Sequence, residues 1–216
     1  MVIMSPKLPN RNYEFQLHAK GYAHVVGIDE VGRGAWAGPL VVGACILKPE
    51  AQLERIRDSK LLSPKQRDYY FDLVQESCLA YGLGWVTAAE IDAIGLTRGT
   101  VVATERAIAA MQITPHYALC DYMPLPTVDY PIERFVRGDN TITAIAAASV
   151  VAKVSRDRFM QEQSRQYDGY DFIHNVGYPS PKHLAALGTL GPSPLHRNLF
   201  LRKFRSRTQQ DAASRP

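Results

Sequence analysis

Two adjacent carboxylates, Asp29 and Glu30, close an apolar run and stand before a glycine-rich turn. Neighbouring side chains of a strand point to opposite faces, so both acids reach one site only if the strand ends or bulges there. The glycines make that possible. A surface turn with two solvated acids is the commoner arrangement of such a pair, because acidic side chains are mostly exposed.

Two more acids favour a functional site. Asp121 follows the apolar 118–120, and Asp139 leads into a long apolar segment, although Asp139 alone would be a helix cap. Four carboxylates in one cluster would repel one another and become protonated unless cations were bound. Oxygen ligands suit Mg²⁺ or Mn²⁺, and no set of Cys and His here suits zinc. Two such ions can support phosphodiester hydrolysis.

The elements that must position these acids alternate between strands and helices. Strands are predicted at 25–28, 40–47, 81–86, 117–120 and 132–136, and helices at 63–79, from 87–90 onwards, at 97–111, 141–166 and 180–188. The first two strands are close enough in the chain to pair antiparallel. The mixture predicts an α/β fold with a mixed sheet.

The bulk properties fit one soluble domain with an anionic partner. The 216 residues are 46% apolar, and 25 Lys and Arg against 21 Asp and Glu give a net charge of +4. We expect an irregular lead-in at 1–20, a catalytic domain at 21–205 and a polar, disordered tail at 206–216. Three cysteines are predicted to be buried free thiols, and no signal peptide or membrane span is visible. We expect a cytoplasmic monomer that binds no membrane.

Several segments in combination resemble the ribonuclease HII family, and the resemblance covers residues 22–204. The segments are 28–34, 58–63, 146–157, 177–179, 182–183, 196–197 and 200. The resemblance implies a ribonuclease H-like fold, with a central mixed sheet flanked by helices and a helical C-terminal region. It also implies four metal ligands, and these are Asp29, Glu30, Asp121 and Asp139.

Three positions depart from the family pattern. Tyr122 follows Asp121, where the family usually has a small residue such as glycine. Arg137 stands where lysine is common, and Asn198–Leu199 replaces a polar residue followed by serine. These departures bear on local geometry rather than on the reaction.

The residues that would read the substrate must sense a 2′-hydroxyl, because that group separates RNA from DNA. Gly32 and Gly34 would let the backbone approach a sugar and Arg33 could bind a phosphate, although a simple tight turn explains the glycines equally well. The resemblance implies that Tyr178 contacts the 2′-hydroxyl and stacks on the next sugar. A partly buried core tyrosine is the alternative.

Three more residues are candidate phosphate ligands. Ser149 and Lys153 share a helix face with Asp157, and the resemblance gives the first two to phosphates. An ion pair between Lys153 and Asp157 is the structural alternative. Lys60 could meet a phosphate or simply be solvated. His183 and His196 would either support the site or be satisfied structural histidines.

The sequence therefore predicts an endonuclease that hydrolyses the RNA strand of RNA/DNA hybrids. It is also expected to cleave on the 5′ side of single ribonucleotides in duplex DNA, leaving 3′-hydroxyl and 5′-phosphate ends. One alternative is another nuclease of the same fold, such as a junction resolvase. The other is a non-catalytic nucleic-acid-binding module, which would have no reason to concentrate negative charge where phosphates dock.

Overall fold

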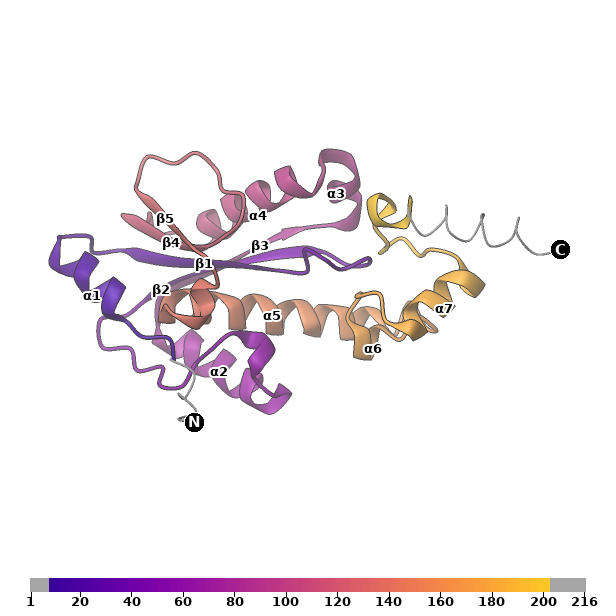
Figure 1. Ribbon diagram of the computed structural model, residues 1–216, viewed down its shortest axis with the longest axis horizontal. Helices are drawn as coiled ribbons and strands as arrows, with labels where there is room; N and C mark the ends of the chain where they lie inside the picture. Colours follow the sequence, from indigo (N-terminus) through magenta and orange to yellow (C-terminus); the bar gives the residue numbers. More distant parts are fainter. Residues whose placement is uncertain (1–7, 203–216) are drawn as a thin grey trace, which may run out of the picture.

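Five strands form one sheet in the order β3-β2-β1-β4-β5 in the computed structural model, which describes residues 8–202 (Figure 1). The strands are β1 (Val25–Val31), β2 (Leu40–Leu47), β3 (Cys78–Val86), β4 (Tyr117–Asp121) and β5 (Ile132–Phe135). β1, β2 and β3 pair antiparallel, whereas β1, β4 and β5 run parallel. The predicted mixed sheet is confirmed.

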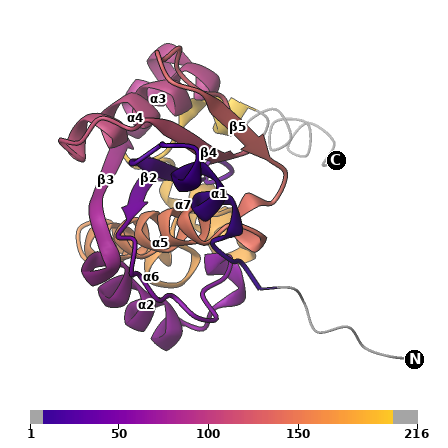
Figure 2. The same cartoon turned by 90° about the vertical axis from the view of Figure 1, so that its left-hand side faces the viewer.

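Helices cover both faces of this sheet. The helices α2 (Pro64–Ser77) and α5 (Thr143–Gln163) lie on one face, and α3 (Ala88–Ile94) and α4 (Leu96–Ala110) lie on the other (Figures 1 and 2). Each face has its own hydrophobic core. The short α6 (Phe172–Asn175) and α7 (Pro181–Leu190) follow α5 at the far end of the molecule and pack on a third cluster.

Local signals in the sequence explain where two of these helices begin. The side chain of Ser63 caps α2 and that of Thr87 caps α3, and in each case the residue three positions later reaches back to complete a capping box. Such reciprocal caps satisfy amide groups that the first turn of a helix leaves unpaired. The helix starts predicted at 63–64 and 87–90 are therefore confirmed.

The long helix α5 packs directly against the backbone of the central strands. A Cβ on Gly27 would lie 2.1 Å from the carbonyl carbon of Ala144, and one on Gly43 would lie 2.4 Å from the carbonyl oxygen of Ala148. Residues 143–152 of the helix are all buried. Glycine in the strands and alanine in the helix thus allow a close approach. This approach brings Ser149 of α5 next to Asp29 of β1.

The prediction of an irregular lead-in at 1–20 is wrong over 12–19, where α1 (Asn12–Ala19) forms. This helix shows almost no amphipathic pattern and depends on contacts far away in the chain. Asn10 exchanges backbone hydrogen bonds with Thr141 and Thr143, and a carboxylate oxygen of Glu14 accepts from the amide of Ala144 at 3.2 Å. Local propensity could not indicate such contacts.

Other expectations differ only in detail. α6 forms inside the 167–181 segment, which is otherwise irregular as predicted, and α5 begins and ends two to three residues inside the predicted range. Cys45, Cys78 and Cys120 are buried and free. No helix within 8–202 has the length and apolarity needed to cross a membrane. The predicted tail at 206–216 lies outside the described residues, as do residues 1–7.

Candidate active site

The acidic residues gather where β4 ends beside β1. The pairing of β1 with β4 stops at Ile28 and Cys120, so Asp29 and Glu30 extend past the last parallel pair. The expected break in β1 does not occur, because Asp29 and Glu30 stay in register with Gly43 and Val42 of β2. Because β4 ends beside β1, Asp29 and Glu30 lie past the last residue pair of these two strands without any bulge in β1.

Asp29 points toward α5. It is the more buried of the two acids in β1, with 5% of its surface exposed. Burial raises its pKa well above the usual value, and a hydrogen bond from Ser149 lowers it. The negative charges of Asp139, Glu30 and Asp121 raise it further. The four acids predicted from the sequence therefore lie within electrostatic range of one another.

A hydrogen bond links Asp121 to the turn that carries Asp139. The backbone amide of Gly138 donates a 2.9 Å hydrogen bond to a carboxylate oxygen of Asp121. Arg137 adopts a left-handed conformation with φ of 57°, and the 3-10 helix η2 (Gly138–Asn140) begins directly after it. Burial, followed by the charges of Asp58 and Asp121, raises the pKa of Asp139 to about 6. This turn holds Asp139 next to the end of β4.

Asp58 belongs to this acidic group, and the sequence reasoning missed it. Its carboxylate accepts the amide of Lys60 at 2.9 Å, which caps the 3-10 helix η1 (Ser59–Leu61), and its charge acts on Asp139. The signal was present, because 58–63 matches a family segment. A turn-capping role alone would explain an Asp before Ser-Lys. Only the fold shows that Asp58 also lies near Asp139.

Glu30 faces the opposite side of β1 from Asp29. One of its carboxylate oxygens lies 3.6 Å from a guanidinium nitrogen of Arg33, and the other is buried without a hydrogen-bond partner. Burial raises the pKa of Glu30, and the charge of Arg33 lowers it. The side chain borders a hollow of about 440 Å³, whose lining residues are Glu30, Arg33, Tyr122, Met123, Pro124 and Arg134.

The donor set fits hard divalent cations. All the gathered ligand atoms are carboxylate oxygens, which Mg²⁺ and Mn²⁺ prefer. The unpaired oxygen of Glu30 is an acceptor that a cation would satisfy. Within 8–202, however, no three His, Cys, Asp or Glu side chains are close enough together to hold a metal ion. The carboxylates are neighbours that must draw closer to coordinate an ion.

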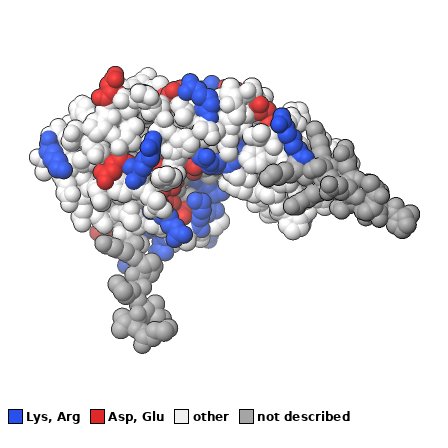
Figure 3. Space-filling model, turned by 45° about the horizontal axis from the view of Figure 1, so that its top comes forward, with Lys and Arg blue, Asp and Glu red and all other residues white. Residues whose placement is uncertain are grey.

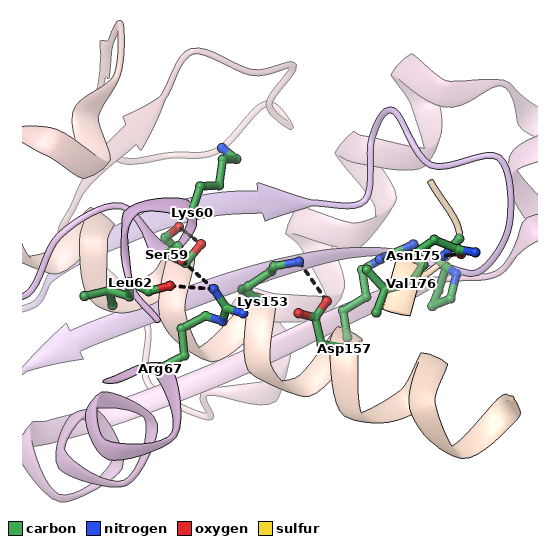
Figure 4. Close-up of polar contacts among 12 residues, drawn as sticks. Ser59, Lys60, Leu62, Arg67, Lys153, Asp157, Asn175 and Val176 are labelled. Carbon is green, nitrogen blue, oxygen red and sulfur yellow. Dashed lines mark hydrogen bonds and ion pairs between the residues drawn. The ribbon is translucent and has the colours of Figure 1, made fainter. Parts of the chain in front are cut away.

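Basic and acidic side chains lie next to one another on the face of the molecule drawn in Figure 3. Burial lowers the pKa of Lys60, but the charges of Asp58, Asp29 and Asp139 outweigh that effect and raise it overall. Lys153 donates to Asp157 at 2.8 Å, so the predicted alternative of an intrahelical ion pair is present (Figure 4). The side chain of Arg67 donates to the carbonyls of Ser59 and Leu62 and fixes the turn that carries Lys60.

Two fully buried arginines, which the sequence reasoning did not single out, hold the turn at 32–39. Arg156 in α5 donates to the carbonyl oxygens of Ala37, Pro39 and Val176. Arg197 donates to those of Gly32, Arg33 and Gly38. Both guanidinium groups are therefore committed to the backbone and are unavailable to a phosphate.

The two glycines that flank Arg33 serve different purposes. Gly32 has φ of +85°, and a Cβ there would lie 2.2 Å from the Nε atom of Arg156, so packing requires glycine. Gly34 is exposed, and a Cβ there would meet only the ring of Tyr178, at 4.0 Å. A half-buried tyrosine ring therefore faces an open stretch of backbone.

Comparisons with known proteins match this arrangement. The family model described as Ribonuclease HII matches residues 26–204. The ribonuclease HII of Thermus thermophilus is 47% identical over 176 residues, which are 82% of this chain and 85% of that protein. The chain belongs to the ribonuclease HII family.

Solved structures support the same fold. The ribonuclease H2 from Pyrococcus horikoshii superposes with a TM-score of 0.69 at 26% identity, covering 86% of this chain and 99% of that one. A ribonuclease HIII in complex with Mn²⁺ has a TM-score of 0.58 at 16% identity and covers 83% of this chain and 67% of that one. The enzyme is thus a ribonuclease H with the ribonuclease H-like fold, which confirms the expected fold class.

Two features of this ribonuclease HII bear on residues predicted from the resemblance. The hydroxyl of Ser149 is buried and lies 3.0 Å from that of Ser59. Ser149 also forms a hydrogen bond with the carboxylate of Asp29, so it helps to hold that side chain in place. A phosphate contact by Ser149 stays a prediction. Tyr122, which departs from the family pattern, is 73% exposed and forms part of the hollow beside Glu30.

Proposed function

We propose that this ribonuclease HII cleaves on the 5′ side of a single ribonucleotide embedded in duplex DNA, as well as within RNA/DNA hybrids. Cleavage leaves a 3′-hydroxyl and a 5′-phosphate. Activity on RNA/DNA hybrids follows from the family, and the finer specificity is the proposal. The observation that supports it is the open backbone at Gly34 opposite the ring of Tyr178.

Gly34 and the ring of Tyr178 lie side by side, so both would contact the same ribose. The backbone at Gly34 carries no side chain that would hold a sugar away, and a phenol offers both a hydrogen bond and a flat apolar face. Because the turn at 32–39 is fixed by Arg156 and Arg197, the position of Gly34 is preformed. A contact surface for one sugar needs only one ribonucleotide to be present, which favours recognition of a single 2′-hydroxyl.

The acids lie near Tyr178. Lys60 is within electrostatic range of Asp29, Asp139 and the phenol of Tyr178, so the tyrosine and the carboxylates surround one basic side chain. We assign Asp29, Glu30, Asp121 and Asp139 as ligands of two divalent ions, either Mg²⁺ or Mn²⁺. When bound, such ions supply an activated water and charge neutralisation at the departing 3′ oxygen.

The chain's own groups set the geometry around that chemistry. Ser149 and the amide of Gly138 orient the carboxylates of Asp29 and Asp121 through their hydrogen bonds. Lys60, Lys153 and Arg33 form a basic border that would hold the phosphates on either side of the cleaved bond. Burial of Asp29 and Asp139 excludes water from their protein-facing sides.

The deciding experiment uses a DNA duplex with one ribonucleotide, a matched all-DNA duplex, and an RNA/DNA hybrid. With Mg²⁺ we expect one cut 5′ of the ribonucleotide, no cut in the all-DNA duplex and none after chelation. Asp29→Asn should lower the rate by at least about 10²-fold, since even indirect ligand partners cost 10–100-fold. An intact single-ribonucleotide duplex alongside a cleaved hybrid would overturn the finer specificity.

A further inference from the structure

Two histidines form a buried pair behind Tyr178. His183 lies in α7 with none of its surface exposed, and His196 follows α7 with 4% exposed. Their Nε2 atoms are 2.9 Å apart. The backbone of His196 forms an isolated bridge with Ala37 of the turn at 32–39, so the pair connects that turn with the segment carrying Tyr178.

The hydrogen bonds at the two ends of the pair fix which nitrogen carries each proton. At one end, the backbone amide of Ser193 donates to Nδ1 of His196 at 2.9 Å. At the other end, Nδ1 of His183 lies 2.8 Å from the carbonyl oxygen of Tyr178, which can only accept. A neutral imidazole has one donor and one acceptor. His196 therefore donates from Nε2 to Nε2 of His183, which donates from Nδ1 to Tyr178.

The remaining neighbours agree with this direction. The hydroxyl of Ser193 lies 2.8 Å from Nδ1 of His196 and can rotate to donate to it. The carbonyl of Ser193, at 3.3 Å from the same nitrogen, already accepts the backbone amide of His196 at 3.0 Å. Every polar atom in the chain from Ser193 to Tyr178 thus has a partner when both rings are neutral.

The surroundings of the pair favour the neutral state. The aromatic rings of Tyr170 and Phe172 pack on both imidazoles. Tyr170, the titratable group among them, donates its hydroxyl to the carbonyl of Gly191 at 2.7 Å. The guanidinium of Arg197 is aimed at the backbone of the turn at 32–39. Burial lowers the pKa of both histidines, and His183 lowers that of His196 further, to about 4.

We propose that His183 and His196 are positioning residues for ribose recognition. In this relay, two neutral rings of defined tautomer transmit the fixed position of the turn at 32–39 to the backbone of Tyr178. The relay holds the ring of Tyr178 beside Gly34, so it sets how the two contact a sugar together. This inference rests on the proposed role of Tyr178 in contacting the sugar.

An additional proton has no place in this relay. Protonating His183 puts two N–H groups face to face between the rings, and protonating His196 puts an N–H against the amide of Ser193. Either change removes a hydrogen bond inside a buried network, where an unpaired group is costly. The relay therefore breaks in acid between the two rings or at Ser193, which uncouples His183 and Tyr178 from the turn at 32–39.

The tautomers can be observed directly, without any assay of activity. In the ¹⁵N-histidine-labelled enzyme, long-range ¹H–¹⁵N correlation spectra distinguish an Nδ1–H ring from an Nε2–H ring. We expect His183 as the Nδ1–H form and His196 as the Nε2–H form, both unchanged from pH 8 to pH 6, while the exposed His174 serves as the reference within the same spectra. Two rings of the same tautomer, or titration of either ring at its ordinary pKa, would overturn the relay.

The link to Tyr178 is tested by a double-mutant cycle on an RNA/DNA hybrid. His183→Leu fills the space without a donor, and His183→Asn keeps a donor near the Nδ1 position. We expect His183→Leu to lower kcat/KM by about 10-fold or more, and His183→Asn to restore most of it. In a Tyr178→Ala background, His183→Leu should have no further effect. Additive losses in the cycle would contradict the inference.

These outcomes separate the relay from the proposed single-ribonucleotide activity. The spectra and the cycle on the hybrid do not depend on whether one ribonucleotide in DNA is cleaved. A wild-type enzyme that ignores single ribonucleotides but shows the expected tautomers and a non-additive cycle would retain the relay and lose the finer specificity. Normal single-ribonucleotide cleavage with additive losses would do the reverse.

Discussion

Arg156 and Arg197 hold one backbone turn from two different segments of the chain, and within residues 8–202 neither has a carboxylate as a hydrogen-bond partner. Together they donate to five carbonyl oxygens in the turn at 32–39 and to the carbonyl of Val176. Burial, followed by the nearby charge of Arg156, lowers the pKa of Arg197 to about 9. Two buried cations thus order the backbone beside the acids.

Arg197→Met should destabilise the protein by about 3 kcal/mol, because it leaves the buried carbonyl oxygen of Gly38 without its side-chain donor and leaves that of Gly32 with only the amide of Ala35. Urea denaturation followed by circular dichroism measures the change. Arg98→Met is the matched control, since Arg98 is exposed and its ion pair with Glu105 is long at 3.7 Å. Equal stability of the two variants would mean that the turn does not depend on Arg197.

Replacing each of the two glycines beside Arg33 by alanine should give opposite results. Gly32→Ala should cost about 2–5 kcal/mol, since the new Cβ meets Arg156 and alanine is strained at positive φ. Gly34→Ala should fold normally, yet kcat/KM should fall by up to about 10²-fold, as a 1 Å misplacement of substrate can cost that much. Denaturation curves and rates on a hybrid separate the cases. A fully active Gly34→Ala enzyme would argue against a sugar at that position.

Asp58→Asn should weaken the apparent affinity for the metal by about 10–100-fold, which is the usual effect of removing a group next to the ligands. The reason is that Asp58 adds negative charge beside Asp139, and that charge favours a bound cation. Titrating the rate with Mg²⁺ should show a higher midpoint and a similar plateau at saturation. A lower plateau with an unchanged midpoint would instead point to a direct role in the reaction.

Glu14 should make stability depend on pH in an unusual direction. Burial raises its folded-state pKa from 4.5 to about 7, so the folded protein binds more protons than the unfolded chain between these values. The unfolding free energy should therefore fall as pH rises from about 4.5 to 7, by about 3 kcal/mol from this group. Comparing wild type with Glu14→Gln at several pH values isolates the effect. The variant should gain stability relative to wild type as pH increases, and a constant difference would contradict this.

Much of the fold was accessible from the sequence because it is encoded locally. A few neighbouring residues are enough to predict the capping boxes at Ser63 and Thr87 and the buried strand at 40–47. α1 was missed since its stability comes from contacts such as that of Glu14 with Ala144, 130 positions away. Contacts between residues that distant leave no local pattern in one sequence.

The candidate site divides in the same way. Asp29, Glu30, Asp121 and Asp139 could be proposed because each follows or precedes an apolar element, and the structure brings them within electrostatic range. Three features could not be derived from the sequence. They are the end of β4 beside Asp29, the proximity of Asp58 to Asp139, and the backbone partners of Arg156 and Arg197. Each depends on how separate segments meet, which residue types alone do not specify.

The close contact of α5 with Gly27 and Gly43 has a consequence for how the acids can gather around ions. Asp29 sits on a platform whose backbones already touch, so that platform cannot move inward. Asp139 instead lies in a turn that begins at the left-handed residue Arg137 and is joined to the end of β4 by the hydrogen bond from Gly138 to Asp121. Binding of divalent ions should therefore be asymmetric. Asp29 should stay in place, and the turn at 137–140 should move toward it.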